Sequence, residues 1–253
     1  WYPVWWVIGG SLRTNSEVVN KGFKVFPNEV TLASEKLLLG NGNLILNGYK
    51  ITLFVTVVGT FCSIIVNGMM GYVLSRKRVA GRKFMNLYVL LTMLFNGGMV
   101  PWYLICTRYL HLKNNIFALI LPSVVSAWYI FLIRNYFSGI PEEIYEAAKI
   151  DGCSYYTIFT KIIFPLMVPT MITGCIFSFM WRWDDFLGAL LYVNKTEKYP
   201  VSLALKMFCD PSSSSDYGAM FAMATLSILP AVLIFFCLQR YLVEGISTSG
   251  LKG

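Results

Sequence analysis

Five apolar segments, each about twenty residues long, constrain this chain more than any other feature. They cover residues 51–74, 86–106, 116–133, 163–183 and 217–238. A helix needs about 20 mostly apolar residues to cross the roughly 30 Å hydrocarbon core of a bilayer. The composition agrees, because 56% of the residues are hydrophobic and 13% are charged, against about 25% charged in soluble domains. The sequence therefore predicts an all-α, polytopic transmembrane helix bundle.

A shorter apolar segment opens the sequence. Residues 1–10 read WYPVWWVIGG, which is too short to cross the hydrocarbon core. They lack the basic start and the cleavage site of a secretory signal peptide. We interpret residues 1–10 as the tail of a first span whose start is missing from this sequence, so that residues 1–253 form a single transmembrane domain with six spans.

The basic residues predict how the spans are oriented. The sequence SRKRVAGRK, residues 75–83, carries five basic residues beside the end of a predicted span. Short loops that are dense in lysine and arginine face the cytoplasm. Counting spans from this loop places residues 134–162 and the tail, 239–253, in the cytoplasm as well. Residues 11–50 and 192–216 are then expected on the outer side.

The cytoplasmic loop, residues 134–162, is the strongest candidate for a functional site. Pro141 suits the first position of a helix, where its missing N–H costs nothing. Glu142, Glu143 and Glu146 would then lie in the first turns of that helix, where the helix dipole stabilises negative charge. The pattern predicts a short amphipathic helix on the cytoplasmic face.

The residues that follow predict a turn and a second helix. Gly152 is expected to end the first helix, and Ser154 is expected to cap another that runs to Pro165. Ala147, Ala148 and Gly152 give the first helix a side of small residues, which the backbone or an aromatic side chain of a partner can approach closely. The sequence thus predicts a helix–turn–helix elbow that docks to a soluble partner. A surface helix without a partner is the alternative.

The spacing of these residues resembles the EAA loop of bacterial ABC-importer permeases. That pattern has E-A-A, three residues, Gly, nine residues, Ile, one residue, an apolar residue and Pro. The matching residues are Glu146, Ala147, Ala148, Gly152, Ile162 and Pro165. Phe164 stands where the family usually has Leu, which is a conservative departure. The resemblance implies that the elbow, including Glu143 and Asp151, fits a cleft on a cytoplasmic ATPase subunit and transmits its opening and closing.

Other segments resemble the permeases of maltose-type sugar importers. They are GYVLSR at residues 71–76, NGGMVPWY at 96–103, WDDF at 183–186 and the tail QRYLVEGISTSGLKG at 239–253. The resemblance implies that Arg240, Gly250 and Lys252 contact the ATPases. It also implies a second homologous permease, two ATPase subunits, an extracellular solute-binding protein and an oligosaccharide cargo. A peptide or amino-acid cargo is the alternative within the same class.

Any nucleotide chemistry is expected on partner chains. The sequence has no GxxxxGK[ST] phosphate loop, so ATP and Mg²⁺ are expected on the ATPase subunits, and this chain is expected to bind no cofactor. The six cysteines show no metal-ligand spacing, and His111 lies alone in a loop. The net charge of +8 is typical of basic loops at a lipid surface and does not indicate nucleic acid.

Residues 181–186, WRWDDF, place three charges at the end of a predicted span. A charge at the bilayer centre costs about 2.5–3.5 kcal/mol by insertion scales, so this segment is expected at the outer interface or beside a wet cavity. Arg182 and Asp185 are three positions apart and can pair on one helix face. Trp181 and Trp183 suit either an interfacial aromatic belt or stacking on sugar rings.

The candidate substrate pathway consists of four residues. Trp183 and Asp184 would lie at its outer mouth, and Asn96 and Trp128 lie in other spans. A membrane-embedded lipid or sugar transferase, with WRWDDF as its acidic site, is the alternative from a different class. The sequence has no carboxylate pair with a nearby base and no Ser–His–Asp set, which favours a transport subunit over an enzyme.

Overall fold

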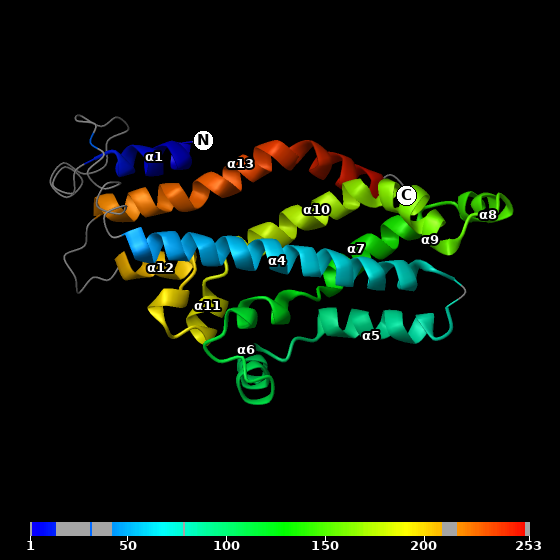
Figure 1. Cartoon of the computed structure of the whole chain (residues 1–253), viewed down its shortest axis with the longest axis horizontal. Coiled ribbons are helices and arrows are strands. Elements are labelled where there is room, and N and C mark those ends of the chain that lie inside the picture. Colours follow the sequence, from blue (N-terminus) through cyan, green and yellow to red (C-terminus); the bar gives the residue numbers. More distant parts are fainter. Residues whose placement is uncertain (1, 14–30, 32–41, 78, 209–216, 251–253) are drawn as a thin grey trace. The chain divides into compact units, whose positions relative to one another are not determined.

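Every element in the described part of this chain is helical (Figure 1). The computed structural model describes residues 2–13, 31, 42–77, 79–208 and 217–250. The α-helices are α1 (Tyr2–Ser11), α4 (Gly42–Ser75), α5 (Arg82–Leu94), α6 (Met99–Leu104), α7 (Ala127–Ser138), α8 (Glu142–Ile150), α9 (Tyr155–Ile158), α10 (Phe164–Trp183), α11 (Leu187–Tyr192), α12 (Val201–Phe208) and α13 (Tyr217–Gly250). Five short π or 3₁₀ segments complete them: η1 (Ile105–Tyr109), η2 (Ile116–Leu119), η3 (Leu121–Ser123), η4 (Phe159–Ile163) and η5 (Thr196–Lys198). The all-α prediction is confirmed.

Three of the described helices are long and apolar enough to cross a membrane. They are Leu44–Ser75, Tyr156–Trp183 and Met220–Cys237, and they contain or overlap the spans predicted at 51–74, 163–183 and 217–238. Two bent helix pairs raise the number to as many as five if each pair is one span. Helix α1 has ten residues; that it ends a sixth span stays a prediction.

The span predicted at 86–106 is broken. Its two halves, Arg82–Leu94 and Met99–Tyr109, meet at an angle of 110°. The break lies at Asn96 and Gly98, where the Asn96 Oδ1 atom accepts a hydrogen bond from the Gly98 N–H at 2.9 Å. Gly98 has φ +86°, which glycine adopts at little cost. Helix α5 ends at Leu94, where Phe95 is extended, and the Asx turn with the Gly98 conformation then redirects the chain into α6, although the apolar run continues.

The span predicted at 116–133 is also divided, with a bend of 44° between Ile116–Ser123 and α7. Ser126 caps α7, because its Oγ atom accepts a hydrogen bond from the Tyr129 N–H. Asn67 of α4 crosses the break: its Nδ2 donates to the Val124 carbonyl at 2.8 Å, and its Oδ1 accepts from the Ser126 N–H at 2.9 Å. One buried amide therefore satisfies backbone groups that the break leaves unpaired.

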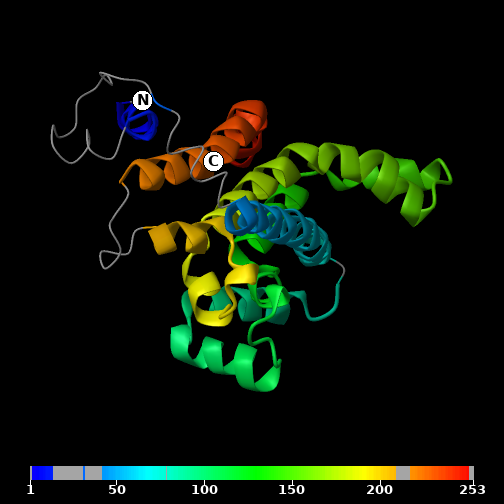
Figure 2. The ribbon, with the colours of Figure 1, turned by 60° about the vertical axis from the view of Figure 1, so that its left-hand side comes forward.

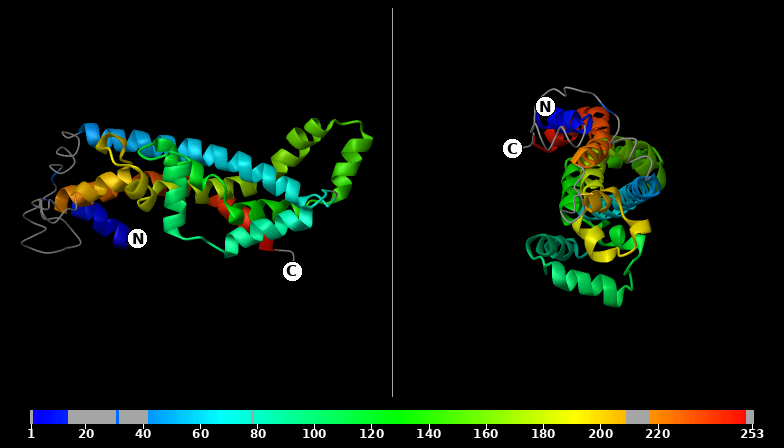
Figure 3. Two further views of the ribbon diagram at one scale, coloured as in Figure 1. Left: turned by 90° about the horizontal axis from the view of Figure 1, so that it is seen from below. Right: turned by 90° about the vertical axis from the view of Figure 1, so that its left-hand side faces the viewer.

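The chain forms two compact units. Unit 1 comprises Trp1–Thr56, Cys106–Leu119 and Trp181–Ile234, and unit 2 comprises Val57–Ile105, Ile120–Met180 and Phe235–Gly253. The core of unit 1 includes Ile45, Ala204, Ala222 and Met223, which come from α4, α12 and α13. In unit 2, the elbow formed by α8 and α9 projects beyond the neighbouring helices of the unit (Figures 2 and 3).

Candidate functional site

The elbow predicted in residues 134–162 is present, with two changes at its ends. Pro141 occupies the N-cap of α8 with ψ 138°, one position before the helix begins at Glu142. The second helix does not stop at Pro165, because α9 continues through the π-helix η4 into α10. Pro165 is the second residue of α10 and directly follows the π-helix η4, so it lies inside a continuous helical run, where proline removes a hydrogen bond to the preceding turn.

The turn between α8 and α9 follows the prediction. Gly152 has φ +78°; its N–H bonds to the Lys149 carbonyl at 3.1 Å, and the Cys153 N–H bonds to the Ala148 carbonyl at 3.1 Å. These two bonds define a Schellman end to the helix. The Ser154 Oγ atom then accepts from the Thr157 N–H at 3.2 Å, which caps α9.

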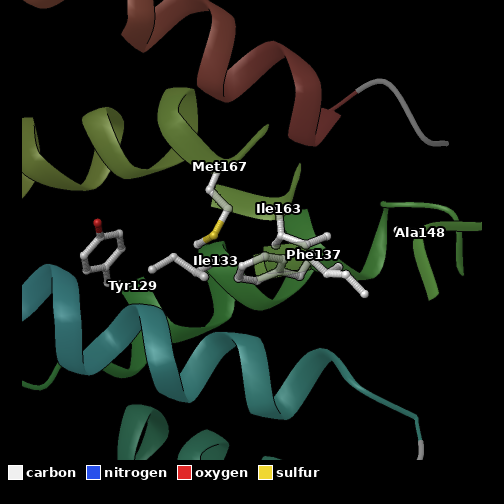
Figure 4. Packing of buried hydrophobic residues seen from close by; sticks show 7 residues of the cluster. Tyr129, Ile133, Phe137, Ala148, Ile163 and Met167 are labelled. Atoms are coloured by element: carbon white, nitrogen blue, oxygen red, sulfur yellow. The ribbon is translucent and has the colours of Figure 1, made fainter. Parts of the chain in front are cut away.

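Ala148 lies elsewhere than predicted. The sequence grouped it with Ala147 and Gly152 on one open side, but Ala148 is only 5% exposed. It belongs to a buried cluster in unit 2 that joins the elbow to α7 and α10 (Figure 4). Other members of this cluster are Phe137 of α7, Ile163 of η4 and Met167 of α10. Ala148, the second alanine of the E-A-A run, therefore packs α8 against α7 and α10.

The exposed face of α8 contains an apolar residue that the sequence analysis did not single out. Ile150 is 86% exposed, and Glu143, Glu146 and Ala147, three to seven positions earlier, are exposed as well. Residues at these spacings share one side of a helix. The signal was available in the sequence, because Ile150 is the apolar residue that recurs one turn after Ala147 on an otherwise polar side.

The remaining predicted coupling residues take different places. Asp151 and Gly152 are exposed at the tip of the elbow, and Pro165 is exposed at the start of α10. Ile162 is partly buried and packs against the cluster around Phe137. Of the tail residues, Arg240 is exposed on α13 and Gly250 ends that helix. Lys252 lies outside the described residues.

WRWDDF lies in unit 1, where Arg182 and Trp183 are buried and the other four residues are exposed or half-buried. Trp183 is 4% exposed, and its Nε1 atom donates to the Ser227 carbonyl of α13 at 2.9 Å. This burial favours a structural role for Trp183 over a place on an open pathway. Trp181 is 57% exposed, as a residue of an aromatic belt would be. Asp184 is exposed.

Asp185 follows the last turn of α10 and is half-buried. Burial raises the pKa of its carboxyl group, and the Gly188 N–H and the charge of Arg182 act against that shift. The Gly188 N–H donates to the Asp185 Oδ1 atom at 2.9 Å, and Ser202 Oγ donates to the Asp185 carbonyl at 3.1 Å. The pairing of Arg182 with Asp185 stays a prediction.

The other two candidate pathway residues belong to unit 2. Trp128 packs edge-on against Phe177 of α10, with ring centroids 5.1 Å apart. Asn96 forms the turn at the break between α5 and α6. The predicted pathway residues therefore divide between the units, with Trp183 and Asp184 in unit 1. No group of three or more potential metal-ligating side chains occurs among the described residues.

Residues 69–248 match the family of binding-protein-dependent transport system inner membrane components. The chain belongs to this family: it is an inner-membrane permease of a binding-protein-dependent ABC importer, a multi-pass transport subunit and not an enzyme. The resemblance given by the EAA spacing is confirmed, and the transferase alternative is set aside.

Several relatives match nearly the whole chain. The polygalacturonan/rhamnogalacturonan transport system permease protein YtcP of Bacillus subtilis is 32% identical over 261 residues, which cover 98% of this chain and 91% of YtcP. The arabinooligosaccharides transport system permease protein AraQ of Halalkalibacterium halodurans is 29% identical over 256 residues, 100% of this chain and 91% of AraQ.

A solved structure supports the fold. The crystal structure of a bacterial ABC transporter involved in the import of the acidic polysaccharide alginate contains a chain that matches with a TM-score of 0.86 and 28% identity. The match covers 95% of this chain and 90% of that one. The helical architecture is therefore that of an ABC-importer permease.

Proposed function

We propose that this permease imports oligosaccharides and that its elbow docks into a cytoplasmic ATPase subunit. The observation that carries the docking proposal is the face of α8 formed by Glu143, Glu146, Ala147 and Ile150. An isoleucine that is 86% exposed on a short polar helix gains by burial against a partner. Fully burying such a side chain contributes about 1.5–3 kcal/mol.

The elbow also has the mechanical connection that coupling needs. Ala148 and Ile163 lie in one cluster with Phe137 of α7 and Met167 of α10. Packed side chains of this kind transmit a displacement because protein interiors are close-packed and compress little. A movement of the docked α8 would therefore reach both α7 and α10, which flank the loop in the sequence.

The proposed complex has the composition of a binding-protein-dependent importer. It contains this chain, a second homologous permease, two ATPase subunits that hold ATP and Mg²⁺, and an extracellular solute-binding protein. Closure of the ATPases around ATP would turn the permease pair from inward-open to outward-open. Arg240 and the tail beyond it would provide a second contact with the ATPases.

The oligosaccharide cargo is supported by the relatives. YtcP is a permease for polygalacturonan and rhamnogalacturonan, and AraQ is one for arabinooligosaccharides. The matched solved structure takes part in alginate import. We propose a cargo of the same chemical class, polymeric or oligomeric sugar. Uptake of labelled sugars and peptides by cells that express the whole complex tests this: uptake of peptides without uptake of any oligosaccharide would contradict it.

Ile150→Ser tests the docking face. Losing a buried isoleucine is expected to weaken ATPase binding about 10- to 100-fold, measured as ATPase recovered with the permease in mild detergent. Lys149→Gln is the matched control, because Lys149 is the exposed neighbour of Ile150 on α8, and it should leave recovery close to that of the unchanged protein. Equal recovery of the ATPase with Ile150→Ser and with Lys149→Gln would contradict docking through this face.

A further inference from the structure

Two arginines of unit 2 lie on helices that pack together, Arg82 at the start of α5 and Arg134 in the second half of α7. Helix α5 packs against α7 and the end of α4 through Val89, Ile130 and Leu74. The Arg82 Nε atom donates to the Leu74 carbonyl at 2.8 Å, which fixes the start of α5 to the end of α4. The charge of Arg82 acts on Arg134 near the end of α7. Two guanidinium groups are thus held within electrostatic range of each other.

The positive charge of this pair has no counter-charge among the described side chains. The guanidinium of Arg134 lies over the Phe131 ring, 5.5 Å from its centroid, and its Nε atom is buried without a hydrogen-bond partner. Among residues 79–208 and the other described segments, no carboxylate forms an ion pair with Arg82 or Arg134. Partly buried charges normally have a counter-charge, so the pair is suited to bind an anion.

We propose that Arg82 and Arg134 bind the phosphate of an anionic phospholipid headgroup. Arginine binds phosphate oxygens through two parallel N–H donors. Inorganic phosphate offers the same chemistry, but the surface beside the pair favours a lipid. Helix α5 continues from Arg82 with exposed apolar side chains: Leu90 is 41% and Met93 48% exposed, and they lie eight and eleven positions after Arg82, on the same side of the helix.

The dimensions of α5 agree with a lipid. Its 13 residues span about 20 Å at 1.5 Å per residue, which is comparable with one leaflet of a bilayer about 40–45 Å thick including headgroups. Charges at one end of the helix and apolar side chains along it match a headgroup above its acyl chains. Arg76, Lys77 and Lys83 nearby would attract anionic lipid to the same surface. The proposal rests on the cytoplasmic placement of the elbow.

The proposed lipid site lies beside the residues that hold the elbow in place. Arg134 lies three residues before Phe137 on α7, and Phe137 belongs to the buried cluster that fastens the elbow. A bound headgroup would hold the end of α7 that supports α8. Anionic lipid is therefore expected to strengthen the coupling between the ATPases and the membrane helices, in addition to occupying the site.

The test uses the complete complex in nanodiscs of phosphatidylcholine, with or without phosphatidylglycerol, and counts retained lipid by native mass spectrometry. Loss of a charged hydrogen bond should lower retention of phosphatidylglycerol by about tenfold or more in Arg134→Gln and Arg82→Gln. Lys83→Gln removes one positive charge from an exposed neighbour of Arg82. It should lower retention of phosphatidylglycerol by less than about fivefold. Arg134→Lys keeps the charge without the planar fork and should also retain less lipid.

The outcomes separate the possible occupants. Equal retention in the unchanged protein, Arg134→Gln and Arg82→Gln would overturn the proposal, because diffuse attraction then accounts for the lipid. Thermal stabilisation by inorganic phosphate in pure phosphatidylcholine, lost in Arg134→Gln, would confirm the anion site and assign it a soluble occupant. If the subunits of Arg134→Gln dissociate with no change in retained lipid, the lipid proposal is overturned, and Arg134 is assigned to an ion pair with a carboxylate of a partner subunit. Lipid retention is independent of ATPase docking, so Ile150→Ser should not change it.

Discussion

At the scale of single residues, the turn between α8 and α9 is set by neighbouring residues, whereas the burial of Ala148 is set by the helices that pack around it. Gly152 and Ser154 took their predicted roles because a helix end is decided by a few neighbouring residues: one glycine at φ +78° and one hydroxyl that accepts an N–H. Ala147 and Ala148 are chemically identical, yet only Ala148 is buried. The difference depends on where α7 and α10 approach α8, which no local pattern encodes.

The close approach of Gly174 to Tyr129 gives a sharp prediction. A Cβ at Gly174 would overlap the Tyr129 ring, and Tyr129 is 2% exposed with its hydroxyl donating to the Met171 carbonyl. We expect Gly174→Ala to destabilise the protein by about 1–3 kcal/mol through overpacking, measured by thermal unfolding in detergent. Adding Tyr129→Leu should recover part of the loss, because the two substitutions share one space. Additive losses would contradict this account.

The stability of the protein should depend on the protonation of Asp185. Burial raises the pKa of its carboxyl group from the ordinary value of 3.8, so the folded state binds a proton more tightly than the unfolded state. The contribution of Asp185 to the free energy of unfolding therefore falls as pH rises from 3.8 through the raised pKa. Asp185→Asn should remove this contribution from the pH profile of the melting temperature. If the melting temperature changes with pH by the same slope in both proteins, Asp185 does not cause the pH dependence of stability.

At the scale of helices, apolar runs predicted where spans occur but not where they break. Residues 86–106 are as apolar as a straight span, and the 110° bend arises from the Asn96 side chain and the backbone of Gly98. Hydropathy measures transfer of side chains from water and is insensitive to such turns. The break at residues 124–126 is likewise stabilised from a distance, by Asn67 of another helix.

Asn67 should be critical for the divided span that contains α7. It is fully buried and bonds to the Val124 carbonyl and the Ser126 N–H. Asn67→Leu keeps a similar size but leaves the Ser126 N–H unpaired, at a cost of about 1–3 kcal/mol, and leaves the Val124 carbonyl with the Ser63 hydroxyl as its donor. We expect a lower melting temperature and faster hydrogen exchange at residues 124–130.

Ser63→Ala is the matched control for this span, because Ser63 Oγ also donates to the Val124 carbonyl at 2.8 Å but leaves both bonds of Asn67 to the break in place. Its effect on stability and exchange should be clearly smaller. Effects of equal size in the two variants would mean that Asn67 is not the main support of the break.

At the scale of the whole molecule, the elbow accounts for most of what the sequence predicted about function. Six residues with fixed spacing, from Glu146 to Pro165, indicated a permease class that residues 69–248 confirm. The spacing is informative because a docking helix must combine a polar, accessible side with a sharp turn and a firm connection to the membrane helices. The substrate pathway has no such local signature, and its candidate residues divided between the two units.

Docking and transmission should be separable by mutation. Ile150 is exposed on α8, whereas Ala148 points into the cluster shared with α7 and α10. Ala148→Leu adds buried volume there, which costs about 1–3 kcal/mol and shifts the backbone, but leaves the exposed face intact. We expect this variant to recover the ATPases normally and to hydrolyse ATP with little transport per ATP, whereas Ile150→Ser should lose the ATPases themselves.

Transport and ATP hydrolysis measured on the same proteoliposomes, normalised to assembled complex, distinguish these two defects. If Ala148→Leu instead loses its ATPases while transport per assembled complex stays normal, the buried cluster serves assembly only. Movement of the ATPases would then have to reach the membrane helices by another route, for which the contact that we propose at the exposed Arg240 of α13 is the alternative.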